Sequence, residues 1–289
     1  MTQNASRSGA PPDHAAPLPA GTVDTHFHVF GPAARYPYAE GRSYTPGDAS
    51  LDDYLRALAP LGVARGVLVQ PSVYGTDNTC MLDALRAPPL PLRGIAVVDA
   101  DVTEAELDAM HALGVRGIRI NLVFAAGKGF ETARALAPRL KARGWHVQFL
   151  VDVSTLPDLR AAVAGLDVAL VFDHMGHVPA AKGVGDPGFR ALLALMAEGR
   201  AWAKVSGAYR MTAPGARPPY GDVAPFAAAV LAANPERVVW ASDWPHTALH
   251  VPMPDDADLA AMVLDWVRGP ALRQRLFVTN PQALYGFDP

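Results

Sequence analysis

The sequence has 289 residues, a formal net charge of -3 and a pI near 6.3. This balance gives no electrostatic case for binding nucleic acid or an anionic membrane, so we expect a small-molecule substrate. Cys80 is the only cysteine, which excludes a disulfide within the chain and a thiolate metal cage. The length suits one closed α/β barrel, which typically takes about 250 residues.

The first 20 residues are rich in Pro, Ala and small polar residues and show no periodicity. We therefore predict a disordered N-terminal tail over residues 1–20, followed by a single domain over residues 21–289. The tail has no apolar segment typical of a secretory signal, and the chain has no hydrophobic run long enough to span a bilayer. These features predict a cytoplasmic protein. Nothing in the sequence specifies an oligomeric state.

From Thr22 onward, short β-branched runs alternate with amphipathic segments such as LDDYLRALAPLG and TEAELDAMHALG, which predict helices. We predict eight strands, in TVDTHFHVF, ARGVLVQPS, LRGIAVVD, VRGIRINLV, WHVQFLVD, VALVFDHMG, AWAKVSG and RVVWASDWP. Thr103 and Glu106 indicate a capping box. Three glycines indicate helix C-termini: Gly62, Gly114 and Gly144. Eight strand–helix units predict an α/β fold, a single (β/α)₈ TIM-type barrel.

Polar side chains stand at the ends of most predicted strands. His26 and His28 lie two residues apart on the first strand, so their imidazoles should face the same side. The other polar residues at strand ends are Gln70, Ser72, Tyr74, Arg119, Asn121, Gln148, Asp173, His174, Ser206, Tyr209, Arg210, Asp243 and His246. Catalytic groups of such barrels gather at the carboxyl ends of the strands, so these residues predict an active site there.

Three of these motifs resemble the amidohydrolase superfamily: the HxH of His26 and His28, the pair Asp173 and His174, and the SDWP segment at 242–245. Within it, VDTHFHVFGP, YPY, SYTPGDAS, GTDN and RIN resemble the 2-pyrone-4,6-dicarboxylate lactonase branch. The resemblance implies hydrolysis of a lactone, often in bacterial breakdown of aromatic compounds. It also implies a catalytic aspartate at the eighth strand and no metal.

The residues themselves permit this chemistry. An aspartate beside neutral imidazoles can take a proton from water, while histidines hydrogen-bonded to a lactone carbonyl stabilise negative charge on its oxygen. We assign the general base to Asp243, and by resemblance the polarising residues are His26, His28 and His174. The alternative role for Asp243 is an N-cap or a structural ion pair. We expect partial burial to raise the pKa of Asp243 above its ordinary value of about 4.

A metal is the weaker prediction. The resemblance implies that a binuclear site of this superfamily would need a bridging lysine or glutamate on the fourth strand and a histidine on the fifth, where this chain offers Arg119 or Asn121, and Gln148. A single zinc or manganese ion remains an alternative, with the ligands His26, His28, His174 and Asp243. The guanidinium of Arg119, if it points inward, would repel this ion, so we expect no metal cofactor.

The resemblance departs at the substrate. Where the pyrone-dicarboxylate lactonases carry basic residues that hold carboxylates, this chain has Phe124 and Ala125 after RIN, and His177. Arg119 and Arg210 are retained and can clamp one carboxylate. Each lost charge-assisted hydrogen bond is worth about 1.5 to 3 kcal/mol, which favours a less charged lactone of muconolactone or sugar-acid type. The other candidate substrate-binding residues are Ser72, Tyr74, Tyr44, Gln148, Asn121 and Lys128.

Two other functions stay open from the sequence. A metal-dependent decarboxylase of the same superfamily would share the HxH, the Asp–His pair and the aspartate of the eighth strand. A barrel that only binds a ligand is disfavoured, because binding alone does not need three histidines together with Asp243. His246 can line the mouth of the barrel. Lys204 shares a strand face with Ser206, so an ion pair and a substrate contact are both open for it.

Overall fold

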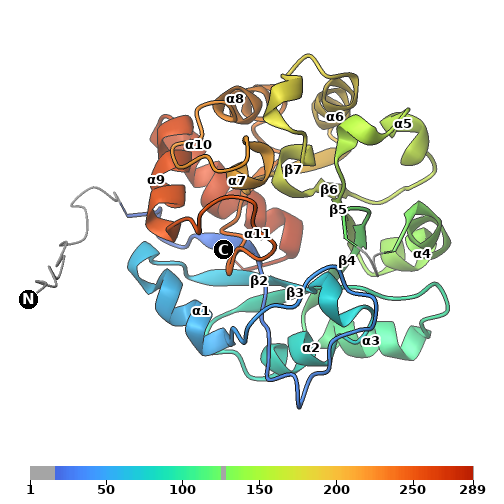
Figure 1. Ribbon diagram of the computed structural model, residues 1–289. Helices are drawn as coiled ribbons and strands as arrows, with labels where there is room; N and C mark the ends of the chain where they lie inside the picture. Colours follow the sequence, from blue (N-terminus) through green and yellow to red (C-terminus); the bar gives the residue numbers. More distant parts are fainter. Residues whose placement is uncertain (1–16, 125–127, 289) are drawn as a thin grey trace, which may run out of the picture.

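The computed structural model describes residues 17–124 and 128–288. Eight parallel strands form one sheet in chain order (Figure 1). They are β1 (Val23–Phe27), β2 (Arg65–Val69), β3 (Leu92–Ala96), β4 (Val115–Asn121), β5 (His146–Leu150), β6 (Leu170–Phe172), β7 (Ala201–Val205) and β8 (Val238–Trp240). A parallel bridge joins Phe27 to Trp244, and Thr25 Oγ1 donates to the Trp240 carbonyl at 2.7 Å. These contacts bring the last strand to the first, so the sheet is the nearly closed barrel that the sequence predicted.

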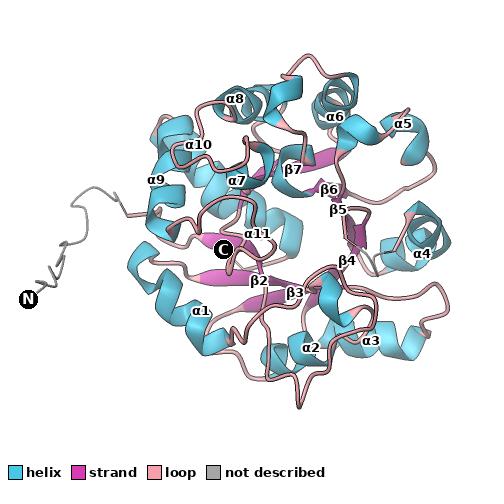
Figure 2. Ribbon diagram, in the orientation of Figure 1, coloured by secondary structure: helices cyan, strands magenta, loops and turns pink. Residues whose placement is uncertain are grey.

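Most of the helices surround the barrel on its outside, while α11 (Asn280–Tyr285) lies near its centre in Figure 2. The helices are α1 (Leu51–Leu58), α2 (Thr79–Arg86), α3 (Glu104–Ala112), α4 (Phe130–Ala142), α5 (Leu159–Ala162), α6 (Pro187–Ala197), α7 (Ala208–Met211), α8 (Ala224–Ala233), α9 (Asp256–Trp266), α10 (Pro270–Gln274) and α11 (Asn280–Tyr285). The predicted capping box is present at the start of α3, where Thr103 Oγ1 accepts from Glu106 N at 3.2 Å and Thr103 N donates to Glu106 Oε2 at 2.7 Å. The glycines predicted at helix C-termini all have positive φ.

The inside of the barrel is closed at the amino ends of its strands by the end of the chain. Tyr285 and Phe287 pack in one cluster with valines of β1 and β2 and with Ile95 of β3. The ring of Tyr285 also meets that of His146, the first residue of β5, at a centroid distance of 5.2 Å. The barrel therefore has a floor built from α11, and its open end lies at the carboxyl ends of the strands.

The predicted tail falls mainly on residues 1–16, which lie outside the described residues. Leu18, which the prediction placed in the tail, is buried in the main core with 6% of its surface exposed. Packed structure therefore begins before residue 21. The described part of the chain contains no helix with both the length and the apolar character needed to cross a bilayer.

Candidate active site

Four of the predicted catalytic side chains converge at the carboxyl ends of β1, β6 and β8. His26 Nε2 and His28 Nε2 lie 3.2 Å apart, so the two rings face one point, as the alternation of the strand predicted. The Oδ1 atom of Asp243 lies 3.8 Å from His26 Nε2 and 3.9 Å from His28 Nε2. His174 Nε2 lies 3.7 Å from the other oxygen, Oδ2.

Tight turns place the two side chains that follow β6 and β8. His174 has a φ of 50° and Asp243 a φ of 66°, both in the left-handed region that residues other than glycine seldom occupy. Such conformations cost about 1 to 3 kcal/mol each and persist only where surrounding contacts hold them. His174 Nδ1 lies 3.0 Å from Ser206 Oγ, a contact that fixes the ring against β7.

The carboxylate of Asp24 on β1 forms hydrogen bonds with the turn after β8. Its Oδ1 accepts from the backbone N–H of Ser242 at 2.9 Å and of His26 at 3.1 Å, and its Oδ2 accepts from Ser242 Oγ at 2.5 Å and Tyr54 OH at 3.1 Å. Burial raises the pKa of Asp24 to about 6 although these hydrogen bonds lower it. Asp24 was not among the residues predicted from the sequence, and its position two residues before His26 was the available signal.

The two oxygens of Asp243 differ in their surroundings. Oδ2 accepts hydrogen bonds from Tyr209 OH at 2.5 Å and from Arg210 Nε at 2.6 Å. Oδ1 is buried and has no hydrogen-bond partner among the described residues. Burial raises the pKa of Asp243, but the charge of the adjacent Arg210 holds it well below its usual range. The expected rise in this pKa is therefore wrong, because the charge of Arg210 was assigned to the substrate and not to Asp243.

Burial also keeps the histidines neutral. It lowers the pKa of His26 well below its ordinary value, that of His28 to about 4 and that of His174 to about 3. The Nδ1 atom of His28 lies 2.7 Å from the carbonyl of Val69, and because a carbonyl can only accept, this nitrogen carries the hydrogen. Neutral His28 therefore directs the lone pair of Nε2 toward Asp243 Oδ1.

The converging atoms fit one divalent cation. His26, His174 and Asp243 offer ligand atoms within 4.8 Å of one another, and all three residues are buried. His28 Nε2 faces the same point, with a lone pair and no hydrogen to donate. Metal-binding imidazoles usually donate Nδ1–H to a carboxylate or carbonyl, which is the arrangement of His28 with Val69. Imidazole nitrogen and carboxylate oxygen are ligands of zinc and manganese.

Asp173 forms a second, fully paired group beneath His26. Its Oδ1 lies 3.2 Å from His26 Nδ1 and 3.4 Å from Lys204 Nζ, and its Oδ2 accepts from Arg119 at 3.2 Å and Gln148 at 3.1 Å. Lys204 is fully buried and also donates to Gln148 Oε1 at 2.8 Å. Lys204 thus forms the ion pair left open by its sequence. The inward charge of Arg119 is paired with Asp173, so it opposes a nearby cation less than we expected.

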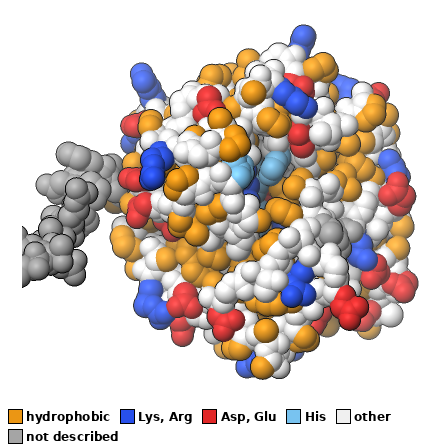
Figure 3. Space-filling view, viewed as in Figure 1, with side chains coloured by type: hydrophobic (Ala, Val, Ile, Leu, Met, Phe, Trp, Pro, Cys, Tyr) orange, Lys and Arg blue, Asp and Glu red, His pale blue; other side chains and the backbone are white. Residues whose placement is uncertain are grey.

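A narrow cavity opens over these groups. Its wall consists of His28, Tyr44, Arg119, Phe124, Leu150, His174, His177, Arg210, Asp243 and Thr247. Histidine side chains reach the surface near the centre of the face drawn in Figure 3. Phe124 and His177, which stand at positions of basic residues in the resembled branch, both belong to the wall, and burial lowers the pKa of His177 to about 4. Ala125 lies outside the described residues.

Other predicted substrate-binding residues are placed away from this wall. Within the described ranges they are Ser72, Tyr74, Asn121, Gln148 and Lys128. The hydroxyl of Tyr74 accepts from Gly31 N at 3.1 Å, and its ring packs in the core together with the turn that contains Ser72. Asn121 Oδ1 accepts from the backbone N–H groups of residues 123 and 124, each at 3.0 Å. Lys128 pairs with Asp99.

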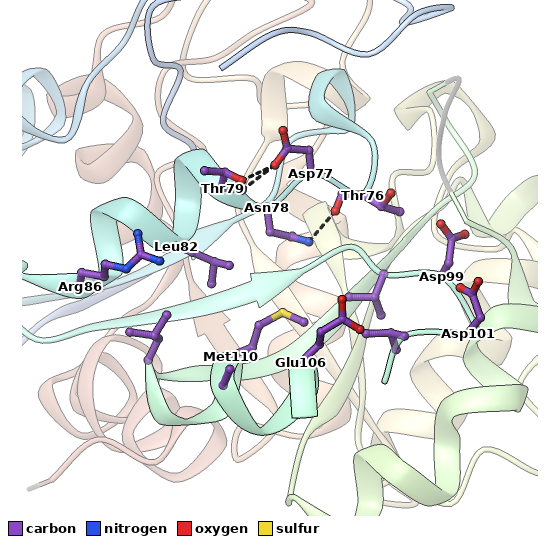
Figure 4. A pocket seen from close by; sticks show the side chains of 14 residues that line it. Thr76, Asp77, Asn78, Thr79, Leu82, Arg86, Asp99, Asp101, Glu106 and Met110 are labelled. Carbon is purple, nitrogen blue, oxygen red and sulfur yellow. Dashed lines mark hydrogen bonds between the residues drawn. The ribbon is translucent and has the colours of Figure 1, made fainter. Parts of the chain in front are cut away.

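A larger hollow, of about 530 Å³, lies between α2 and α3 (Figure 4). Carboxylates from Asp77, Asp99, Asp101 and Glu106 stand around it, and apolar side chains such as Met110 form part of its wall. It includes none of the histidines at the strand ends. The smaller cavity is the better candidate site, because buried ionisable groups with shifted pKa values converge on it.

Comparisons with known proteins support the resemblance that the histidine and aspartate motifs indicated. The amidohydrolase family model matches residues 23–287. The chain is 39% identical over 279 residues to a 4-sulfomuconolactone hydrolase of Rhizobium radiobacter, and 38% identical over 277 residues to a 2-pyrone-4,6-dicarboxylate hydrolase of Comamonas testosteroni; each match covers 93% of this chain and 91% of the relative. A crystal structure of an Agrobacterium tumefaciens protein, 31% identical, superimposes with a TM-score of 0.85 over 94% of this chain and 98% of that one. The chain therefore belongs to the amidohydrolase family, as its histidine and aspartate motifs predicted.

Proposed function

We propose that this protein is a hydrolase that opens a small anionic lactone by attack of water on the ring carbonyl. The observation that carries the proposal is the buried Oδ1 of Asp243, which has no hydrogen-bond partner among the described residues and faces the histidines at the wall of a cavity. Two relatives whose names state a lactone substrate support it.

Asp243 acts as the general base. Arg210 keeps its carboxylate ionised, so Oδ1 can accept a proton as the oxygen of water bonds to the carbonyl carbon. The bond between the carbonyl carbon and the ring oxygen then breaks, and Asp243 returns its proton to the departing oxygen. The product is the open hydroxy acid, and the carboxylate is regenerated.

His28 presents an acceptor, not a donor, to the reacting carbonyl. Neutral His28 has no hydrogen on Nε2, and the lowered pKa of each histidine opposes a second proton. These features support one zinc or manganese ion, held by His26, His174 and Asp243 with His28 beside them, in place of the metal-free site that the sequence favoured. Such an ion supplies Lewis-acid polarisation of a carbonyl when bound.

The wall of the cavity supports a substrate with one anionic group. Arg119 Nε is buried without a partner among the described residues, so this guanidinium can still donate to a carboxylate. Arg210 is already engaged by Asp243 and by the carbonyl of Thr247 at 3.2 Å. Phe124 adds an apolar surface at the position of a basic residue. A monoanionic lactone, of muconolactone or sugar-acid type, fits this wall better than a dicarboxylate. We also propose a cytoplasmic location, which the buried free thiol of Cys80 supports.

A panel of purified substrates tests the reaction. It would contain the pyrone dicarboxylate, a muconolactone, an aldaric acid lactone and a neutral lactone, with acid release followed over time. Hydrolysis that is fastest on a monoanionic lactone is expected. Carbon dioxide released from aromatic acids, with every lactone left intact, would show a decarboxylase instead.

Elemental analysis and chelation test the ion separately. We expect about one equivalent of zinc or manganese in the purified protein, loss of turnover on chelation and recovery when the ion is returned. Full activity after complete removal of metal would reject the ion and leave lactone hydrolysis standing.

A further inference from the structure

We propose that Tyr209, His246 and Asp256 form a positioning chain that holds Asp243 with its free oxygen toward the cavity. The inference rests on the proposed role of Asp243 as the general base. None of the three residues lines the cavity within the described ranges, so they act through Asp243 and not on the substrate.

The hydrogen-bonded residues of this positioning chain run without a break from the cavity to the start of α9. Tyr209 is fully buried, and its hydroxyl lies 2.5 Å from Asp243 Oδ2 and 2.9 Å from His246 Nδ1. His246 Nε2 lies 3.0 Å from Asp256 Oδ1. The rings of Tyr209 and His246 meet at 87°, with centroids 5.3 Å apart, so the pair is also held by packing. Asp256 is the first residue of α9, next to the N-cap Asp255.

The hydrogens that each group carries decide which group donates and which accepts at each contact of the positioning chain. The carboxylate of Asp243 can only accept, so Tyr209 donates its single hydroxyl hydrogen to Oδ2. The hydroxyl oxygen then accepts from Nδ1–H of His246, and the carboxylate of Asp256 accepts from Nε2–H, so the two contacts form together when both ring nitrogens carry a hydrogen. Asp256 holds the far side of the imidazole and fixes its plane. Removing a member therefore takes away a donor from Asp243 or frees the group that orients this donor.

The consequence falls on the orientation of the carboxylate. Its last torsion is broad and nearly two-fold, so the chain must select which oxygen faces the histidines. Tyr209 and Arg210 both bind Oδ2, and together they leave Oδ1 toward His26 and His28. A shift of about 1 Å in a reacting group can cost roughly a hundredfold in rate. Tyr209 and His246 are therefore positioning residues of the reaction.

Two pairs of variants test the chain kinetically. Tyr209→Phe removes the donor, and we expect kcat on the best lactone to fall about tenfold to a hundredfold with little change in KM. Tyr220→Phe is the matched control, because the buried hydroxyl of Tyr220 has no partner among the described residues and should leave kcat unchanged. His246→Asn keeps an N–H near the position of Nδ1, so it should retain more of kcat than His246→Leu.

A crystal structure of Tyr209→Phe gives a readout that needs no substrate. We expect the carboxylate of Asp243 to rotate away from its wild-type position. Three results would each contradict the positioning role. They are an unchanged orientation of the Asp243 carboxylate, an unchanged kcat in Tyr209→Phe, and equal kcat in His246→Asn and His246→Leu. If wild type hydrolyses no lactone, the proposed function fails, and the Asp243 conformation alone decides this inference. If Tyr209→Phe does not fold, the structure of Asp256→Asn decides it, with a displaced His246 ring expected and an unmoved one contradicting the chain.

Discussion

Asp173 and Asp243 are both fully buried carboxylates at the carboxyl ends of barrel strands, yet their oxygens have different surroundings. Both oxygens of Asp173 face donors, from His26, Lys204 and other residues, whereas Asp243 leaves Oδ1 without one among the described residues. In each case burial raises the pKa and neighbouring cations hold it well below the usual range. Burial and charge are therefore alike in the two residues. From the number of satisfied oxygens we propose a structural role for Asp173 and a chemical role for Asp243.

The largest effect should come from the unsatisfied carboxylate. Asp243→Asn is nearly isosteric, so we expect the fold to persist while kcat falls about a hundredfold to ten-thousandfold through loss of the base. Steady-state kinetics on the best lactone, with thermal unfolding as the control for the fold, measures this. Turnover near that of wild type would remove Asp243 from the reaction and end the contrast with Asp173.

The satisfied carboxylate should instead govern stability. Asp173→Asn leaves Lys204 and Arg119 buried without their counter-charge, so we expect the free energy of unfolding to fall by about 3 to 5 kcal/mol. Urea unfolding measures this. Asp167→Asn is the control, because its pair with Lys141 is exposed to solvent and contributes little to stability. Equal effects of the two variants would show that Asp173 is not the structural centre proposed here.

Buried neutral histidines should make stability depend on pH. Both ring nitrogens of His146 are buried without partners in the described structure, and burial lowers its pKa to about 3. The unfolded chain takes up this proton near pH 6.5, so stability is lost as the pH falls below that value, by about 1.4 kcal/mol per unit for each such histidine. Asp24, with a pKa of about 6, opposes the loss below pH 6.

Urea unfolding at several pH values between about 7.5 and 5 checks this dependence. His146→Leu should weaken the slope, because one group no longer takes up a proton on unfolding. The same slope in wild type and His146→Leu would mean that His146 carries its proton in the folded protein.

The smallest kinetic effects are expected from the two arginines in the wall of the cavity, and the two variants should differ in whether KM or kcat changes. Arg119→Met should raise KM for an anionic lactone about tenfold and spare a neutral one, because a carboxylate clamp acts on ground-state binding. Arg210→Met should lower kcat as well, since Arg210 binds Asp243. Kinetics on a matched pair of anionic and neutral lactones distinguishes them. Equal losses on both substrates in Arg119→Met would show that Arg119 only supports Asp173.

The fold was predictable because its signals are local. Eight β-branched runs and the amphipathic segments between them specify the barrel, and the two-residue spacing of His26 and His28 places both rings on one face. The capping box at Thr103 depends on a residue only three positions away. Patterns of this range need no knowledge of the rest of the chain.

The remaining features depend on distant or turned segments. Asp24 owes its role to Ser242, 218 residues later, a pairing that no local pattern encodes. Tyr74 was expected at the cavity because it follows β2, but the tight turn over Ser72–Tyr74 carries its ring into the core. Arg210 was predicted to bind substrate, and α7 also brings it to Asp243, a contact that the sequence did not reveal. Strand ends can be predicted from a sequence more readily than the direction in which the following turn aims a side chain.

Because α11 forms the floor of the barrel, the base of the barrel is covered only after the end of the chain has been synthesised. The first strands of the barrel can be made and paired long before Tyr285 and Phe287, which cover their apolar residues, leave the ribosome. Until then Val23, at the start of β1, and its apolar neighbours in this cluster lack the cover of Tyr285 and Phe287. The nascent chain therefore exposes an apolar face until its last residues emerge, and a chain truncated before residue 285 keeps that face permanently open to water and to aggregation.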